Sequence, residues 1–283
     1  VPGDSWDYDS VQHLILAELN IGGKQRKVIM QANKDGFYYV IDRVTGQLLS
    51  AQPFSTVNWA KGIDQKTGRP IVNPEAYYGK EAISISPGGG GAHNWSPMSF
   101  NPNTGLVYIP TSTTSSPFTY AAADAYPGTG TGTARPAPPN PRPSPPAIGP
   151  EPLEGQGNRG ALVAWDPVKA REVWRQPYPR DGSGGTLTTA GGLVIQGTPN
   201  KTLAIYRATD GRKLWEAPVQ TVPIAGAISY EVGGEQYIAV NAGWGGGLAH
   251  VQANSFRDLN VSTARLLVFK LGGTAQLPPQ PDV

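Results

Sequence analysis

Short apolar runs separated by turn-forming residues recur along the whole chain. The clearest runs are four to seven residues long, and they lie at 27–30, 36–42, 105–109, 160–166, 192–197, 201–206, 236–240 and 265–270. Runs of this length, rich in Val, Ile, Leu and Tyr and punctuated by Gly and Asp, predict β-strands. Helical periodicity is weak throughout, and its best example is 11–18. The pattern therefore predicts an all-β chain with one weak helical segment.

Three strand pairs share one pattern, in which an apolar strand leads through a capping Asp or Thr and a tight turn into a second apolar strand. The copies lie at 39–49, 162–174 and 204–215. In such a hairpin the Asp or Thr caps the turn and Gly supplies the positive φ. Repeated hairpins with recurring Trp residues are typical of β-propellers, whose four-stranded blades repeat at roughly 40–50 residues. We therefore expect a partial propeller of about four or five blades.

One segment interrupts the strand pattern. Residues 121–157 contain an alternating Thr/Gly tract at 128–133 and a Pro-rich tract at 134–152. Such a composition cannot pack a core, so we expect a solvated or polyproline-II-like loop lying over the propeller. A ligand for proline-recognition domains is the minority alternative. Residues 274–283 indicate a Pro-rich tail or linker, so the expected domain spans 1–273.

Composition narrows the function classes. Charged residues make up 16% of the chain, and the net charge of +2 comes from scattered Lys and Arg. This gives no case for nucleic acid or a membrane surface. No apolar run approaches the ~18 residues of a membrane span. The chain has no Cys, which excludes disulfides, thiolate zinc sites and Cys nucleophiles within it. Because a dense polar and aromatic motif follows Val1 with no lead-in, we expect that upstream sequence is missing.

Two carboxylates near the start of the chain form a candidate cation site. Asp7 and Asp9 stand two residues apart, so on an extended segment both would project to the same side. Oxygen ligands suit Ca²⁺ or a harder trivalent ion, although such ions take six to eight oxygens and further ligands must come from elsewhere. A solvated or capping Asp turn is the alternative.

Two further clusters carry candidate chemistry. Lys34, in the turn 31–36, could pair with a carboxylated ligand, or the segment could be an ordinary polar turn. The run 88–91 consists of four glycines, which let backbone approach a neighbour closely, and His93-Asn94-Trp95 follows. A P-loop is rejected because no GK[ST] follows the glycines. A Ser/His/Asp triad through His93 remains a formal alternative without a neighbouring nucleophile.

Four segments together resemble the second half of pyrroloquinoline-quinone (PQQ) dependent alcohol dehydrogenases in order and spacing. They are Trp6–Asp9, Gln31–Arg43, Val57–Ala60 and Ala92–Pro102. The resemblance covers nearly the whole chain. The segment 164–174 is also similar to the tryptophan-docking repeat of that family, with Ala170 in place of the repeat glycine. The third copy departs further, at Ile205 and Arg207, which we expect to weaken that blade joint.

The resemblance implies a set of residue roles. Asp7 matches the family's catalytic base beside the metal, and Lys34 matches the lysine that hydrogen-bonds the quinone oxygens. Asn94 and Trp95 match residues at the rim of the PQQ cofactor. Asp7 and Asp9 together match the metal-site carboxylates, and an Asp at the position of Asp9 is the pattern of lanthanide-dependent members. The resemblance therefore implies PQQ with a lanthanide(III) ion, with Ca²⁺ as the alternative.

The resemblance also implies the reaction and its setting. The reaction is oxidation of a small primary alcohol in the periplasm, with a cytochrome c-type electron acceptor. The family's remaining metal ligands, its cofactor-stacking Trp and its disulfide belong to the N-terminal half, so we expect a fragment, or a chain completed by another, with little turnover alone. The alternatives are a non-catalytic propeller scaffold of the same repeat family and an aldose dehydrogenase. A cytochrome domain could follow Leu277, but no Cys-x-x-Cys-His haem motif is present in this chain.

Overall fold

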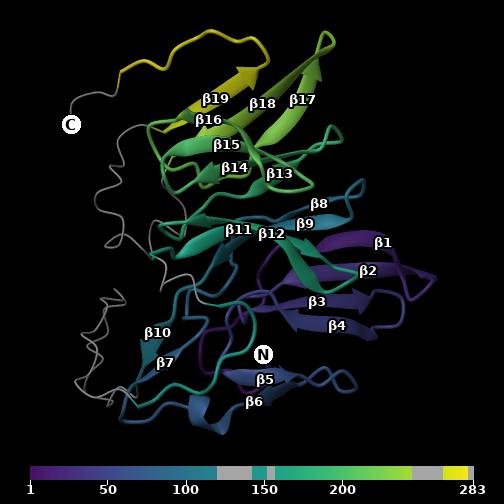
Figure 1. Cartoon of the computed structure of the whole chain (residues 1–283), viewed down its shortest axis with the longest axis vertical. Coiled ribbons are helices and arrows are strands. Elements are labelled where there is room, and N and C mark those ends of the chain that lie inside the picture. The colour runs from purple at the N-terminus through teal and green to yellow at the C-terminus, as the bar shows by residue number, and fades with distance from the viewer. Residues whose placement is uncertain (120–141, 152–156, 244–263, 280–283) are drawn as a thin grey trace. The chain divides into compact units, whose positions relative to one another are not determined.

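The computed structural model describes residues 1–119, 142–151, 157–243 and 264–279 (Figure 1). The chain divides into two compact units. The first consists of Val1–Asn94 with Ser112–Glu154, and the second of Trp95–Thr111 with Gly155–Val283. Within the described ranges the only helical element is one 3₁₀ turn, η1 (Pro74–Ala76), and every other regular element is a strand. The all-β prediction is confirmed.

The first unit is built on one four-stranded antiparallel sheet whose strands follow chain order. These strands are β1 (Ile15–Ile21), β2 (Lys24–Ala32), β3 (Phe37–Asp42) and β4 (Leu48–Pro53). Two short strand pairs accompany the sheet: β5 (Ala60–Ile63) with β6 (Pro70–Val72), and β7 (Ile83–Ile85) with β10 (Ser116–Phe118). The aromatic core of this unit includes Trp6, Tyr8, Phe37 and Trp59.

The second unit contains three antiparallel sheets (Figure 1). The first has the order β12-β11-β9-β8 and joins β8 (Ser99–Asn101), β9 (Leu106–Ser112), β11 (Gly160–Asp166) and β12 (Arg171–Tyr178). The next joins β13 (Thr186–Thr188), β14 (Leu193–Thr198), β15 (Thr202–Arg207) and β16 (Lys213–Pro218). The last joins β17 (Ile228–Val232), β18 (Glu235–Ala242) and β19 (Arg265–Lys270). Consecutive meanders of this kind agree with the expected blades.

The segment with weak helical periodicity is not a helix. Its second half belongs to β1, where Ile15 pairs with Met30 and Leu16 with Ile29. Ile15 and Leu19 are buried while Leu16 is exposed, so the strand keeps its apolar contacts on one face. Pairing with the apolar β2 outweighs the local preference, since helix propensity is only a weak prior.

The hairpin turns use the chemistry expected from the repeats. Asp42 Oδ1 accepts hydrogen bonds from the amides of Val44 and Thr45 at 2.9 and 3.1 Å, and Gly46 has φ of 76°. Asp166 caps the second copy in the same way. There Ala170 stands at the glycine position and takes a φ of 50°. The hairpin geometry therefore forces a left-handed conformation on an alanine.

A tryptophan joins the second hairpin copy to the third. Trp174 Nε1 donates to the carbonyl of Ala208 at 3.0 Å, and the Tyr108 hydroxyl donates to the same oxygen at 3.1 Å. A Cβ at Gly211 would lie 2.6 Å from the Trp174 ring, so the indole rests directly on that glycine. Trp174 therefore docks on the neighbouring turn. It does so although Arg207 departs from the family repeat at this position.

Part of the Pro-rich segment docks on the first unit. The Val57 and Ile148 amides donate to each other's carbonyls at 2.9 and 2.7 Å, and Ile148 packs against the aromatic core of the first unit. The Thr56 hydroxyl donates to Pro150 O at 2.6 Å. Proline favours an extended backbone, which suits this strand-like docking of the one Ile among the prolines. Residues 120–141 and 152–156, which hold the Thr/Gly tract, lie outside the described residues.

Candidate active site

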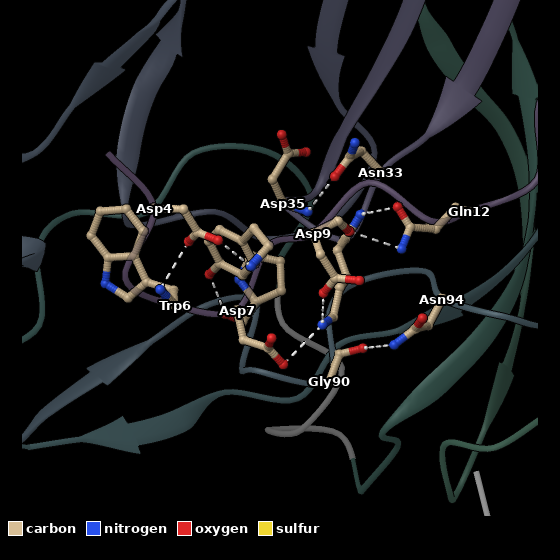
Figure 2. A network of polar contacts seen from close by, with 12 residues as sticks. Asp4, Trp6, Asp7, Asp9, Gln12, Asn33, Asp35, Gly90 and Asn94 are labelled. Atoms are coloured by element: carbon tan, nitrogen blue, oxygen red, sulfur yellow. Dashed lines mark hydrogen bonds and ion pairs between the residues drawn. The ribbon is translucent and has the colours of Figure 1, made fainter. Parts of the chain in front are cut away.

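The acidic segment at the start of the chain is folded around the Asp4 side chain. Asp4 Oδ1 accepts from the Trp6 amide at 2.9 Å, and Asp4 Oδ2 accepts from the Tyr8 amide at 2.8 Å (Figure 2). Asp7 lies between these two bonds and has a φ of 69°. The segment is therefore a carboxylate-capped turn and not the extended strand expected from the sequence.

Two aromatic side chains anchor this turn. Trp6 and Tyr8 are buried, and Trp6 Nε1 donates to Ala76 O at 3.2 Å. The Tyr8 hydroxyl donates to Pro87 O at 2.5 Å. Burial raises the pKa of Tyr8 well above its usual value, so it remains a neutral donor. With both neighbours fixed inside, the Asp7 side chain is left at the surface with 73% exposure.

Lys34 brings the two predicted carboxylates together. Its Nζ lies 2.9 Å from Asp7 Oδ2 and 2.5 Å from Asp9 Oδ1. The Lys34 side chain is only 5% exposed, whereas that of Asp9 is 49% exposed. A desolvated ammonium requires paired carboxylates, because an uncompensated buried charge is costly. The expected convergence of Asp7 and Asp9 is present, although the turn produces it and strand alternation does not.

The glycine run packs against the lysine turn. A Cβ at Gly91 would lie 2.1 Å from Lys34 Cγ and 2.9 Å from Lys34 Cα, and Gly91 has φ of 80°. The Ala92 amide donates to the Lys34 carbonyl at 2.9 Å. The close backbone approach expected of these glycines is therefore real, and the neighbour they approach is Lys34.

The two remaining predicted residues divide between the units. Asn94 Nδ2 donates to the Gly90 carbonyl at 3.0 Å (Figure 2), and Asn94 Oδ1 is buried without a hydrogen-bond partner among the described residues. Trp95 belongs to the second unit and is 50% exposed. The structure thus groups Asp7, Asp9 and Lys34, with Asn94 bonded to the same glycine run.

Sequence reasoning missed Asp35. It is buried, its Oδ1 accepts from the Phe37 amide at 2.8 Å, and its Oδ2 accepts from the Tyr39 hydroxyl at 2.7 Å. The Trp59 indole donates to the Asp35 carbonyl at 2.9 Å. Burial raises the pKa of Asp35 to about 7, against the smaller lowering effect of the Phe37 amide. The Asp-Gly-Phe spacing, typical of a carboxylate-capped turn, was the available signal.

The residue types in the described ranges limit what this site alone could hold. These ranges contain no group of three or more His, Cys, Asp or Glu residues that could hold a metal ion. Asp7 and Asp9 would therefore supply only part of a metal's ligand shell. Among the same residues, no helix is long and apolar enough to cross a membrane.

Comparison with family models supports the fold at both ends of the chain. Residues 1–52 match the model described as glucose/ethanol/alcohol dehydrogenase, beta-propeller domain. Residues 154–261 match the model described as outer membrane protein assembly factor BamB. The first match contains Asp7, Asp9 and Lys34, and the second lies beyond them.

Curated proteins are similar to this chain over nearly its whole length. Quinohemoprotein alcohol dehydrogenase ADH IIB of Pseudomonas putida is 44% identical over 98% of this chain and 39% of its own length. The 1-butanol dehydrogenase (cytochrome c) of Thauera butanivorans is 42% identical over 98% of this chain and 39% of its own length. These matches support the PQQ-dependent quinoprotein alcohol dehydrogenase family. The chain spans about two-fifths of the length of these quinoprotein relatives.

Solved structures of alcohol and methanol dehydrogenases share the fold. The quinohemoprotein alcohol dehydrogenase ADHIIG of Pseudomonas putida matches with a TM-score of 0.82 and 43% identity, over 99% of this chain and 42% of that one. A europium-containing methanol dehydrogenase matches with a TM-score of 0.73 and 33% identity, over 88% of this chain and 42% of that one. Together with the four meandering sheets, these matches confirm the predicted partial-propeller fold class.

Proposed function

We propose that this chain is the C-terminal part of a PQQ-dependent alcohol dehydrogenase that oxidises primary alcohols to aldehydes. The observation that carries the proposal is the convergence of the Asp7 and Asp9 carboxylates on the Lys34 ammonium. The quinohemoprotein alcohol dehydrogenases, which are similar over nearly the whole chain, support oxidation of an alcohol.

The residues present fit the implied cofactor and metal. Asp7 and Asp9 direct hard oxygen donors at one point, where a cation, the Lys34 ammonium, already lies. Within the part of the chain that the structure describes, Asn94 Oδ1 is a buried acceptor without a hydrogen-bond partner, and a donor group on a bound cofactor would satisfy it. The donor set is incomplete for an ion of six to eight ligands, so the proposal requires additional ligands from outside this chain.

Asp7 is the proposed catalytic base. Its exposed carboxylate can accept the hydroxyl proton of the alcohol, and the Lys34 ammonium, 2.9 Å away, orients that carboxylate. The chemistry supplied by PQQ and the metal, when bound, would be a hydride acceptor and a Lewis acid. Loss of the proton to Asp7 and of the hydride from carbon converts the alcohol to the aldehyde.

Three side chains are proposed to hold the cofactor. Lys34 would donate hydrogen bonds from its ammonium to the quinone oxygens, and its buried stem limits the positions that the ammonium can reach. Asn94 and Trp95 would contact the cofactor rim, through the amide oxygen of Asn94 and the half-exposed indole of Trp95. We extend the proposal to one propeller domain over residues 1–273, with 274–283 as a tail or linker.

The proposed metal is a lanthanide(III) ion. Asp9 adds a second carboxylate beside Asp7, and the additional negative charge favours a trivalent ion over Ca²⁺. The similarity to a europium-containing methanol dehydrogenase agrees with this choice. We expect La³⁺ to restore activity to metal-free protein better than Ca²⁺, and we expect Asp9→Ala to remove that preference. An equal response of wild type and Asp9→Ala to both ions would contradict the assignment.

The remaining partners follow from the same proposal. Relatives carry about three-fifths of their length outside the matched region, and we propose that this part, or a separate chain, completes the propeller and the metal site. The name of the 1-butanol dehydrogenase (cytochrome c) of Thauera butanivorans includes cytochrome c, and this supports a cytochrome c-type electron acceptor. We propose a periplasmic location, as expected for this family.

The deciding experiment measures dye-linked alcohol oxidation by this chain expressed together with the part its relatives carry. PQQ and La³⁺ or Ca²⁺ are supplied, and wild type is compared with Asp7→Ala and with Asp64→Ala, a matched change in an exposed hairpin turn. Wild type and Asp64→Ala should turn over, while Asp7→Ala should lose at least about 100-fold in kcat. Full activity in Asp7→Ala would exclude its role as the base.

The match of residues 154–261 to an outer membrane assembly factor favours one competing function, a non-catalytic propeller scaffold. A scaffold would need the sheets and docking tryptophans but not the carboxylate pair. Absence of PQQ-dependent oxidation in the completed wild-type protein, with its fold intact, would favour the scaffold.

A further inference from the structure

Gln12 is a buried amide that links two parts of the candidate site. It is 3% exposed, although glutamine side chains are mostly found at protein surfaces. It lies between the acidic segment and β1, and neither its position nor its neighbours suggested a role from the sequence.

Both ends of the Gln12 amide bind the backbone of residues in the site. Its Nε2 donates to the Asp9 carbonyl at 3.2 Å, and its Oε1 accepts from the Lys34 amide at 3.3 Å. Figure 2 shows the Gln12 amide group turned toward the centre of the network. Asp9 and Lys34 are the same two residues whose side chains form the 2.5 Å ion pair. They are thus joined twice, once through Gln12 at the backbone and once through their own charges.

Further amide groups hold Gln12 in place. Gln31 Nε2 donates to the Gln12 carbonyl at 2.9 Å, and Gln31 Oε1 accepts from Asn33 Nδ2 at 3.1 Å. The same Asn33 amide donates to Ser10 Oγ at 2.6 Å. The acidic segment and the lysine turn are therefore connected by a continuous set of partly buried side-chain hydrogen bonds. Networks of this kind restrict their members more than single bonds do.

The Gln12 contacts fix the relative position of the Asp9 and Lys34 backbones, which their ion pair alone does not fix. The buried stem of Lys34 limits where its ammonium can lie relative to its own backbone, whereas the Asp9 carboxylate is half exposed. An ion pair between such groups does not by itself define where the two backbones lie. The planar Gln12 amide links the two main chains directly, because one group donates to the Asp9 carbonyl and accepts from the Lys34 amide.

We propose that Gln12 is a positioning residue, which sets the separation between the Asp9 and Lys34 backbones and so aligns carboxylate and ammonium for the metal and the cofactor. The inference rests on the proposed function for its catalytic consequence. Its structural part, the clamp on the two backbones, stands on the contacts of Gln12 alone.

The test uses the completed protein with three variants. Gln12→Met keeps the size of the side chain and removes both bonds, and Gln12→Glu keeps the acceptor for the Lys34 amide. Gln25→Met is the matched control, since Gln25 is an exposed glutamine on β2. Hydrogen exchange of the Lys34 amide is measured beside kcat, the KM for the alcohol and the melting temperature.

We expect the Lys34 amide to exchange about tenfold faster in Gln12→Met, and to remain protected in Gln12→Glu and Gln25→Met. We expect kcat to fall about tenfold in Gln12→Met with KM changed less than about twofold, since misalignment of the groups weakens the reaction more than substrate binding. A melting temperature equal to that of the control variant separates positioning from general destabilisation.

Two results overturn the inference. Unchanged Lys34 exchange in Gln12→Met would show that the amide holds neither backbone, whatever the activity. Faster exchange with unchanged kcat would show that the clamp has no catalytic consequence. If wild type itself fails to oxidise alcohols, the proposed function is refuted, and the exchange data still establish or refute the clamp.

Discussion

The Lys34 ammonium lies 2.5 Å from the Asp9 carboxylate, although 25 residues separate them in the chain. One partner comes from the turn at the start of the chain, and the other from the turn between β2 and β3. The contact gathers a base candidate, a metal-ligand candidate and a cofactor-binding candidate into one cluster. Because the lysine is buried and the carboxylates are exposed, substitutions around Lys34 offer sharp tests of the cluster.

Gly91→Ala should damage the lysine turn. The new Cβ would meet Lys34 Cγ at 2.1 Å and Lys34 Cα at 2.9 Å, in a backbone conformation that alanine adopts poorly. We expect a loss of about 1–3 kcal/mol in the free energy of unfolding. Chemical denaturation measures it. The neighbouring Gly90→Ala is the control, since its Cβ would meet nothing within 4 Å, and equal losses in both variants would contradict the packing argument.

Trp174→Phe should weaken the joint between the second and third hairpin copies. The change removes the hydrogen bond from the indole to Ala208 O and part of the packing on Gly211. We expect a loss of about 1–3 kcal/mol in the free energy of unfolding. Trp215→Phe, at a partly exposed indole, should cost less, and thermal or urea unfolding compares the two. A larger effect at Trp215 would argue against docking by Trp174.

Ala170→Gly should stabilise the second hairpin. Ala170 has a φ of 50°, where an L-residue is strained and glycine is not. After allowing for the greater entropy of glycine in the unfolded chain, we expect the free energy of unfolding to increase by about 0.5–1 kcal/mol. The midpoint of urea unfolding reports it. Lys169→Gly, at a position without positive φ, should show no such gain.

Asp35→Asn should change how stability depends on pH. Burial raises the folded-state pKa of Asp35 from 3.8 to about 7, so the folded state retains a proton that the unfolded state releases. This contribution to stability is fully present below about pH 4 and is lost as pH rises to about 7. Relative to Asp35→Asn, wild type should lose stability across this window, on the order of a few kcal/mol.

Asp64→Asn is the control for the pH experiment. Hydrogen bonds from the Thr67 amide and hydroxyl lower the pKa of Asp64, so its contribution is present above its unfolded pKa and is lost as pH falls through the folded one. The two variants should therefore differ from wild type with opposite slopes against pH. Parallel curves for wild type and Asp35→Asn between pH 4 and 7 would show that Asp35 is not held protonated.

Much of the fold could be predicted from local pattern. The β-runs and the capped turns at Asp42 and Asp166 depend on neighbours in the chain, and short-range geometry specifies them. The segment at 11–18 could not be assigned correctly in this way, because its strand depends on pairing with β2. The pairing of Ile148 with Val57 could not be predicted from the sequence either, because a Pro-rich composition does not indicate which residue, here 91 positions away, it will contact.

By itself, the sequence determined the fold class, the hairpin chemistry and the identity of the residues proposed for the site, since each depends on local pattern or on a motif resemblance. Only the tertiary structure decided that Asp7 and Asp9 meet Lys34, that Gly91 packs on that lysine, and that Asp35 and Gln12 are buried beside it. The physical reason is that burial and side-chain contact depend on which distant segments pack together. Residue type and spacing can name the participants, but long-range packing decides which of them touch.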